Sequence, residues 1–230
     1  MTAPLVVITG TGTGIGKTHL TVSLVRAWAR LLDEHGGGAA GVAGLKPLET
    51  GVMAGAPSDR ETLEQASTFH VKRYPPPYML RRAVSPHLAA ADEGVVLRLD
   101  VITASVATVR RLADGVVVEL PGGLFSPLAE GLTNAEVAFA LRADALLLIA
   151  PDRLGVLHDI GAATRAARAQ GLAVSGIILV APEHADTSTN TNAGELSVVT
   201  TLPLVAAIPR ENISVTAQRP ELSRFLRAFR

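Results

Sequence analysis

Short runs of apolar residues recur along the chain, and each is bounded by glycine, proline or polar residues. Runs rich in Val, Ile and Leu without polar alternation are typical of strands that are buried on both faces of a sheet. We expect six such strands, at Leu5 to Thr9, Val42 to Leu45, Val116 to Glu119, Ala145 to Ala150, Gly176 to Val180 and Leu204 to Ile208.

Helix-forming stretches separate several of these strands. The expected helices are Thr18 to His35, Leu99 to Leu112 and Val156 to Gln170. Glycines end the first and the third, at Gly36-Gly37-Gly38 and at Gly171, because glycine readily adopts the left-handed conformation that follows a helix. Strands that alternate with helices form right-handed crossovers, which predicts a single α/β domain over residues 1–230, with a mostly parallel sheet and helices on both faces.

The end of the chain has a helical pattern of its own. From Glu221 to Arg230, one face carries the apolar side chains, which are Leu222, Phe225, Leu226 and Phe229. An apolar stripe of this kind has to be covered in a folded protein. We expect this helix to pack on the body of the protein or on a second subunit.

Composition and charge exclude several classes of protein. Hydrophobic residues make up 48% and charged residues 18%, which allows a sizeable core and argues against disorder. The 21 basic and 21 acidic residues balance, whereas a nucleic-acid-binding protein usually has a basic excess. Without cysteine, disulfides and cysteine-based zinc sites are excluded. No apolar run is long enough to span a membrane, and Met1 to Pro4 contains no basic segment, so we expect a cytoplasmic protein.

A glycine-rich segment follows the first strand and opens the first helix, and it reads Gly10-Thr11-Gly12-Thr13-Gly14-Ile15-Gly16-Lys17-Thr18. In a phosphate-binding loop (P-loop), glycines let backbone N–H groups surround phosphate oxygens, and the helix N-terminus adds positive potential. Lys17 is placed to reach the β and γ phosphates, and the Thr18 hydroxyl suits Mg²⁺. The segment predicts a P-loop NTPase-like fold, although Thr11 stands where the usual pattern has its first glycine.

Two carboxylates are candidates for the same metal ion. Glu119 ends the strand Val116 to Val118, and Asp59 opens a predicted helix. Taken alone, Glu119 could cap the next turn and Asp59 could be a helix N-cap. Because Mg²⁺ is usually bound by one or two carboxylates beside substrate phosphates, the P-loop favours the metal interpretation for Glu119 and makes Asp59 a further candidate.

A second lysine, Lys46, follows the second strand in the segment Leu45-Lys46-Pro47-Leu48-Glu49-Thr50-Gly51. Loops at the carboxyl ends of parallel strands line the ligand crevice of α/β folds. A solvated surface lysine is the ordinary alternative. The proline and glycine around Lys46 constrain the loop and favour a position in the crevice.

These segments, taken in order, resemble the dethiobiotin synthetase family along nearly the whole chain. The P-loop matches the family's Gly-Thr-x-Thr-x-x-Gly-Lys-Thr form, which accounts for Thr11. The other matching segments are Lys46-Pro47 with Thr50-Gly51, Ser58-Asp59, Ser85-Pro86-His87-Leu88 with Glu93-Gly94, Val118-Glu119 with Gly122 to Leu128, Leu154-Gly155 and Ile208-Pro209.

The resemblance implies an enzyme that uses ATP and Mg²⁺ to join CO₂ to 7,8-diaminopelargonic acid and to close a ureido ring, as a homodimer. It implies catalytic roles for Lys17 and Lys46. It implies metal ligands at Thr18, Asp59 and Glu119, and diamine contacts at Thr13, Thr50 and Gly122. The implied nucleotide contacts are Gly14, Ile15, Gly16, Lys17, Thr18, His19, Asp59, Glu119 and Pro209.

The chain departs from the family at three pairs of residues: Leu120-Pro121 for Gly-Ala, His158-Asp159 for Asn-His, and Val180-Ala181 for the Asn-Asp that reads adenine in many members. Val180-Ala181 predicts weak discrimination between nucleotide bases, with Asn190, Asn192 or backbone near Pro209 as alternative contacts.

Two other functions are kept as alternatives. One is a catalytically weak paralogue that binds nucleotide and a protein partner. The other is a nucleotide-operated switch of the Min or partition type, which Gly12 disfavours because such switches have a signature lysine there.

Overall fold

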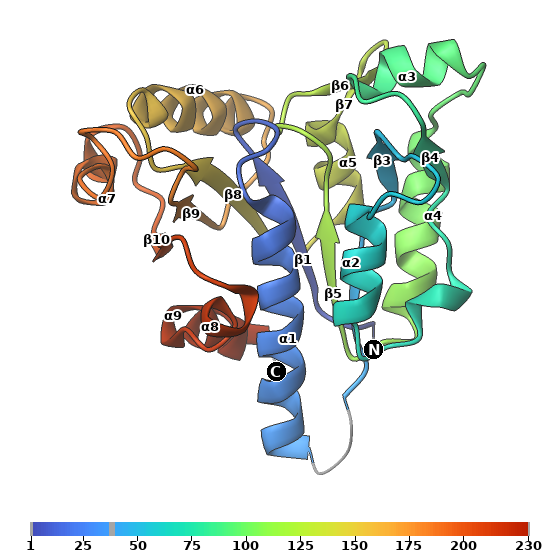
Figure 1. Ribbon diagram of the computed structural model, residues 1–230, viewed down its shortest axis with the longest axis horizontal. Coiled ribbons are helices and arrows are strands. Elements are labelled where there is room, and N and C mark those ends of the chain that lie inside the picture. Colours follow the sequence, from blue (N-terminus) through green and yellow to red (C-terminus); the bar gives the residue numbers. More distant parts are fainter. Residues whose placement is uncertain (1, 37–39, 230) are drawn as a thin grey trace.

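The computed structural model describes residues 2–36 and 40–229, and its centre is a six-stranded sheet in the order β10-β9-β8-β1-β5-β2 (Figure 1). Every neighbouring pair in this sheet is parallel. The strands are β1 (Leu5–Gly10), β2 (Val42–Leu45), β5 (Gly115–Glu119), β8 (Ala145–Pro151), β9 (Gly176–Val180) and β10 (Leu204–Ile208). The α/β fold class and all six predicted strands are confirmed.

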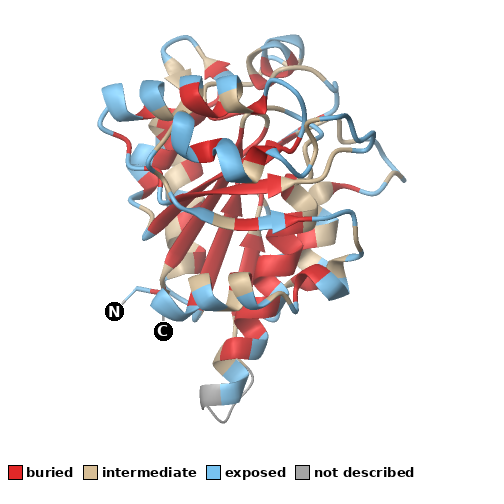
Figure 2. Ribbon diagram, turned by 90° about the vertical axis from the view of Figure 1, so that its left-hand side faces the viewer, coloured by how far each residue is buried: buried red, intermediate tan, exposed pale blue. Residues whose placement is uncertain are grey.

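Alternate residues of the central strand face two separate cores. In β1, Leu5 and Val7 point into one core, and Val6 and Ile8 point into the other. All four are fully buried. The strands of the sheet are largely red in Figure 2, the colour of buried residues. A strand covered on both faces has no polar position, which is why these strands read as continuous apolar runs.

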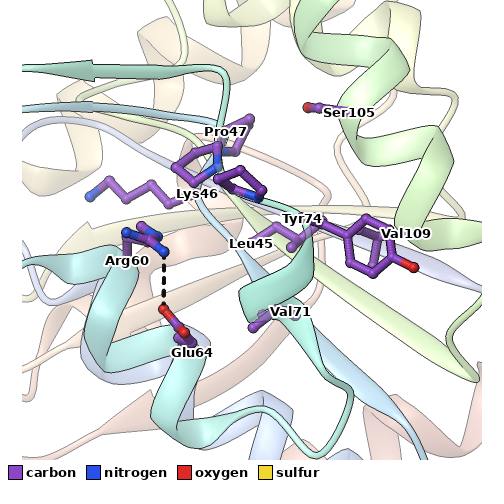
Figure 3. A pocket seen from close by; sticks show the side chains of 12 residues that line it. Leu45, Lys46, Pro47, Arg60, Glu64, Val71, Tyr74, Ser105 and Val109 are labelled. Carbon is purple, nitrogen blue, oxygen red and sulfur yellow. Dashed lines mark ion pairs between the residues drawn. The ribbon is translucent and has the colours of Figure 1, made fainter.

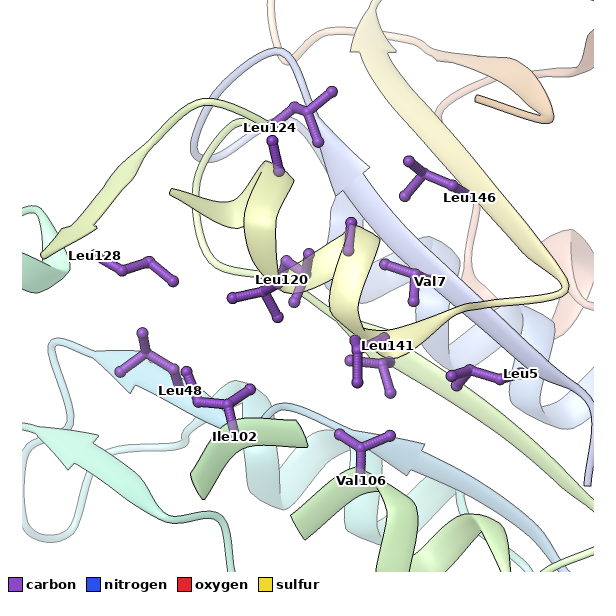
Figure 4. Packing of buried hydrophobic residues seen from close by; sticks show 14 of the residues in the cluster. Leu5, Val7, Leu48, Ile102, Val106, Leu120, Leu124, Leu128, Leu141 and Leu146 are labelled. Carbon is purple, nitrogen blue, oxygen red and sulfur yellow. The ribbon is translucent and has the colours of Figure 1, made fainter. Parts of the chain in front are cut away.

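Helices cover both faces of the sheet. The first core contains side chains of α4 (Leu99–Arg110) and α5 (Asn134–Leu141) (Figure 4). The second contains side chains of α1 (Lys17–Gly36), α2 (Asp59–Ala66) and α9 (Pro220–Leu226). The helix α6 (Val156–Ala169) packs on β8 and β9. The three predicted helices end within two residues of their expected bounds, and Gly37 and Gly38 lie outside the described residues.

The sequence patterns missed the short elements. Strand β3 (Leu48–Thr50) pairs in parallel with β4 (Tyr78–Leu80), and β6 (Pro127–Ala129) pairs antiparallel with β7 (Leu132–Thr133). Strands of two or three residues are too short to show a periodicity. The remaining elements are α3 (Pro86–Asp92), α7 (Asn192–Glu195), α8 (Ile213–Thr216), η1 (Val71–Arg73), η2 (Leu196–Val198) and η3 (Arg227–Phe229).

The C-terminal helix packs on its own chain. Leu222 and Leu226 of α9 are fully buried in the core that contains α1. Phe229 lies with its ring centroid 6.1 Å from that of Trp28 on α1. The apolar face is therefore covered within the protomer and gives no support to a second subunit. None of the helices in the described part of the chain is long and apolar enough to cross a membrane.

Candidate active site

The site lies at the carboxyl edge of the sheet, where β1 is flanked by β5 and β8. The chain leaves β1 towards β2 on one side, and the strands β8, β9 and β10 extend the sheet on the other. Such a reversal of strand order opens a crevice at the carboxyl ends of the strands. The P-loop occupies this position, between the end of β1 and the start of α1.

The backbone of the P-loop turns at two glycines. Gly14 and Gly16 have φ angles of 70° and 89°, a region that residues with a side chain rarely adopt. The helix α1 begins directly afterwards, at Lys17. The Lys17 ammonium donates a hydrogen bond to the Gly12 carbonyl oxygen at 2.6 Å. Burial lowers the pKa of Lys17 to about 8, although the carboxylate of Glu119 opposes this shift.

One cavity of about 640 Å³ collects the predicted site residues. All of them line this cavity except Pro209: Thr13, Gly14, Ile15, Gly16, Lys17, Thr18, His19, Lys46, Thr50, Asp59, Glu119 and Gly122. They come from α1, β3, α2 and β5 and from the loops that follow β1, β2 and β5. Its volume is in the range of small-molecule sites.

A buried ionic cluster forms one wall of the cavity. The Lys46 ammonium lies 2.8 Å from Oε1 of Glu119 and also forms an ion pair with Asp59. The Thr18 hydroxyl donates a hydrogen bond to the same Glu119 oxygen at 2.9 Å. Burial alone would lower the pKa of Lys46, but the carboxylates of Glu119 and Asp59 outweigh it, so the pKa is raised. Lys46 is therefore a buried, charged member of the site.

The side chains of Thr18, Asp59 and Glu119 suit a magnesium ion. Oε2 of Glu119 is buried and has no hydrogen-bond partner among the described residues, so this oxygen is left without a partner in the protein. No group of three or more His, Asp or Glu side chains able to hold a metal occurs within residues 2–36 and 40–229. Two carboxylates and one hydroxyl leave positions for phosphate oxygens and water, which is the coordination that Mg²⁺ prefers.

The structural alternatives for the two acids are wrong. The N-cap of α2 is Ser58, and Asp59 is the first helical residue with its carboxylate turned to Lys46. The Glu119 carboxylate faces Thr18 and Lys46, across the sheet edge, and makes no cap of the following turn.

Pro209 lines a second cavity, of about 560 Å³, on the other side of the P-loop. Gly14, Ile15, Gly16 and His19 line both cavities, so the two adjoin at the start of α1. Burial lowers the pKa of His19, whose ring Nε2 lies 2.9 Å from the Thr216 hydroxyl.

Val180 and Ala181 line the second cavity as well. The Ala181 N–H donates to Ile208 and the Val180 carbonyl accepts from Asp152, so these backbone groups are already paired. Neither Asn190 nor Asn192 lines the cavity, and the Asn192 amide is bound to Asp152 at 2.7 Å. These two asparagines are therefore not placed to read a base there.

The side chain of Leu120, where the family has Gly, does not enter the main cavity. The Leu120 side chain is 1% exposed and lies in the core beside α4 and α5 (Figure 4). Pro121 lines the main cavity, and its carbonyl is held by the Asn134 amide. His158 and Asp159 line a third cavity of about 540 Å³, which also includes Thr13.

A fourth, much smaller cavity is lined by Lys46 and by residues of α2 and α4 (Figure 3). It measures about 30 Å³ and includes the pair Arg60 and Glu64, whose charged atoms are 3.3 Å apart. That volume holds a water or two but no ligand of nucleotide size.

Several residues of the site were missed by sequence reasoning. Ser85, Pro86 and Ser126 line the main cavity although no role was assigned to them. The Ser-Pro-His segment carried a usable signal for the first two. Glu49, in the middle of β3, was also missed; it does not line the cavity but is bound to the backbone of Asp59, which does.

Solved structures with the same fold include a ParA family ATPase from Chlorobium tepidum (TM-score 0.58, 11% identity, 98% of this chain and 96% of that chain covered). The MinD cell division protein of Aquifex aeolicus aligns over 98% of both chains, with a TM-score of 0.58 and 13% identity. At such low identity, these likenesses show the fold alone.

Sequence comparison identifies the family. Residues 5–218 match the AAA domain family. Proteins named ATP-dependent dethiobiotin synthetase are 38% identical in Anaeromyxobacter dehalogenans (89% of each chain) and 33% identical in Rhodopirellula baltica (90% of this chain, 84% of the relative). Another from Rhodococcus jostii is 36% identical over 89% of this chain and 86% of its own. The relatives align with this chain over most of its length, and the residues matched by the family model include the P-loop and the Lys46 segment. The chain belongs to the AAA domain family and to the ATP-dependent dethiobiotin synthetases.

Proposed function

We propose that this protein is an ATP-dependent dethiobiotin synthetase, which converts 7,8-diaminopelargonic acid, CO₂ and ATP into dethiobiotin, ADP and phosphate. The observation that carries the proposal is the placement of Lys46, Lys17 and two carboxylates around one cavity at the end of β1. The names of the relatives, at 33–38% identity, support the same activity.

The reaction needs two amines, one carbon and one phosphoryl group in a fixed arrangement. One amine adds to CO₂ and loses a proton, which gives a carbamate. A carbamate oxygen attacks the γ phosphorus, and the bond to the β–γ bridging oxygen breaks to release ADP. The second amine then attacks the carbamate carbon and loses a proton, the C–O bond to phosphate breaks, and the ureido ring closes. Positioning and charge neutralisation supply most of the rate in phosphoryl transfer.

The lysines of the site are suited to the charges that develop. Lys17, on the first turn of α1 beside the P-loop, neutralises the γ phosphate. Lys46, which is buried and lines the same cavity, stabilises the carbamate and the phosphoryl group in transfer. Thr13, Thr50 and Gly122 line the same cavity and orient the diamine. The nucleotide base occupies the adjoining cavity beside Pro209.

Magnesium completes the site. Thr18, Asp59 and Glu119 would hold the ion, which neutralises phosphate charge when it is bound. The unpaired oxygen of Glu119 supports this assignment.

The test is release of phosphate from ATP in the presence of Mg²⁺ and bicarbonate, with and without 7,8-diaminopelargonic acid, together with mass spectrometry of the product. We expect phosphate release that requires the diamine and matches dethiobiotin mole for mole. Diamine-independent hydrolysis without dethiobiotin would identify a nucleotide-operated switch or a weak paralogue instead.

The proposal also includes a cytoplasmic location and a homodimer, in which each protomer is a single domain. The family resemblance supports the dimer, whereas the apolar face of α9 does not, because it is covered within the protomer. Sedimentation velocity at assay concentration tests the assembly state. A fully active monomer would contradict the dimer.

A further inference from the structure

Glu49 is a buried carboxylate without a cation. It lies in the middle of β3 and is 5% exposed. No lysine, arginine or histidine within the described part of the chain forms an ion pair with it. A buried charge is tolerated only where hydrogen bonds or dipoles replace water. Its partners therefore indicate why this acid is present.

Both oxygens of Glu49 bind the start of α2. Oε1 accepts from the Asp59 N–H at 2.7 Å, and Oε2 accepts from the Arg60 N–H at 3.0 Å. The first N–H groups of a helix have no partner within it, and the helix dipole favours an anion there. Glu49 thus satisfies two helix donors and receives the compensation that its own charge requires.

The rest of the α2 N-terminus is capped without Glu49. The Ser58 hydroxyl accepts from the Glu61 N–H, and the Glu61 carboxylate accepts from the Ser58 N–H in return. Such a capping box satisfies two backbone donors at the start of a helix. What Glu49 adds is a tie between this helix and the strand that follows Lys46.

This tie fixes the position of Asp59. Along the chain, Asp59 is joined to β3 only by residues 51–58, which form neither helix nor strand and include the exposed Met53. Glu49 bridges the two ends of that loop by binding the N–H of Asp59 itself. The Asp59 carboxylate then faces Lys46 in the main cavity.

We propose that Glu49 is a positioning residue, which holds Asp59 at the place where its carboxylate binds the metal of the metal–nucleotide complex. The inference rests on the proposed function, since that function gives Asp59 its metal. Residues that orient metal ligands typically change metal affinity or activity about 10- to 100-fold when they are replaced. A purely structural acid would change stability alone.

The experiment compares the affinity of the full-length protein for AMPPNP, a non-hydrolysable ATP analogue, in Mg²⁺ and in EDTA. The affinity in Mg²⁺ divided by the affinity in EDTA isolates the contribution of the metal. Glu49→Gln keeps the size of the side chain but offers an acceptor to only one of the two N–H groups. We expect it to lower the ratio about tenfold and to leave the affinity in EDTA unchanged. Glu49→Ala is expected to lower it further.

Glu64→Gln is the matched control, because it neutralises another largely buried carboxylate of α2 that contacts neither Asp59 nor the main cavity. Its ratio is expected to equal that of the wild type. Thermal unfolding, followed by the fluorescence of the single tryptophan Trp28, separates loss of stability from loss of metal binding.

Three results would overturn the inference: an unchanged ratio in both Glu49 variants, an equal loss in Glu64→Gln, or a wild-type affinity that does not respond to Mg²⁺. The binding ratio does not depend on turnover. If the wild type made no dethiobiotin, the proposed function would fail, whereas the ratio would still decide the role of Glu49.

Discussion

The ammonium of Lys46 lies 2.8 Å from Oε1 of Glu119, the oxygen that also accepts the hydrogen bond of Thr18. Asp59 forms an ion pair with the same ammonium. A lysine therefore neutralises the two carboxylates that suit Mg²⁺. A metal that bound both acids would compete with Lys46 for their charge.

This arrangement predicts that Lys46 weakens metal binding in the absence of nucleotide. Lys46→Met keeps much of the length and removes the charge. We expect the variant to bind Mn²⁺ about tenfold more tightly or better, because unit charges ~4 Å apart near a protein surface interact by about 4 kcal/mol. Electron paramagnetic resonance of free Mn²⁺ measures the affinity. Equal affinities in variant and wild type would show that Lys46 does not compete with the metal.

Replacing either lysine is expected to abolish ligation, but for different reasons. Lys17→Ala removes the cation beside the P-loop and should weaken nucleotide binding and abolish ligation. Lys46→Ala should abolish ligation and leave Mg²⁺–nucleotide binding nearly intact, because its charge serves the carbamate and the transferred phosphoryl group. Calorimetry with AMPPNP and the dethiobiotin assay separate the two effects. Wild-type ligation by Lys46→Ala would exclude Lys46 from the chemistry.

Nucleotide affinity should fall as the pH rises above about 8. Burial lowers the pKa of Lys17 from 10.5 to about 8, so the free protein loses this proton near pH 8. Phosphate favours the charged ammonium, and binding above pH 8 must therefore take up a proton. The expected loss is up to about tenfold per pH unit. Calorimetry of AMPPNP binding in buffers of different ionisation enthalpy counts the protons.

Lys17→Arg is the control for this titration, because a guanidinium stays charged throughout the range. Its affinity should be independent of pH between 7 and 9.5, and proton uptake by this variant would assign the titration to another group. In the wild type, the unfolded chain holds this proton up to about pH 10.5. The contribution of Lys17 to stability should therefore rise, not fall, between about pH 8 and 10.5.

Discrimination between nucleotide bases is expected to be weak. Val180 presents an apolar side chain in the cavity beside Pro209, and the Ala181 N–H is already bound to Ile208. Apolar slots reject an unmatched ligand poorly, whereas sites built from polar pairs reject it strongly. We expect specificity constants for ATP, GTP, CTP and UTP to differ by less than about a hundredfold. Val180→Asn should raise the preference for ATP, and a wild-type preference of a hundredfold or more would contradict the prediction.

Local patterns were sufficient for the large elements. Continuous apolar runs marked the strands of the main sheet because each is buried on both faces, and the glycines of the P-loop marked the end of β1 and the start of α1. The short pair β3 and β4 carried no such pattern, and neither did α3. Tertiary contacts hold these elements in place. A segment of three to seven residues is too short to show a hydrophobic periodicity in the sequence.

The sequence by itself determined the fold class and the P-loop, because burial periodicity and glycine-rich turns are local properties of the chain. It also pointed to Lys17, Lys46, Asp59 and Glu119, which line one cavity in the structure. Only the tertiary structure decided that Lys46 lies between Asp59 and Glu119, which are 13 and 73 residues away along the chain. It also decided that Glu49 binds the start of α2 and that Leu120 points into the core. Such contacts depend on how strands and helices pack, and residue order alone does not specify the direction of a side chain at the end of a strand.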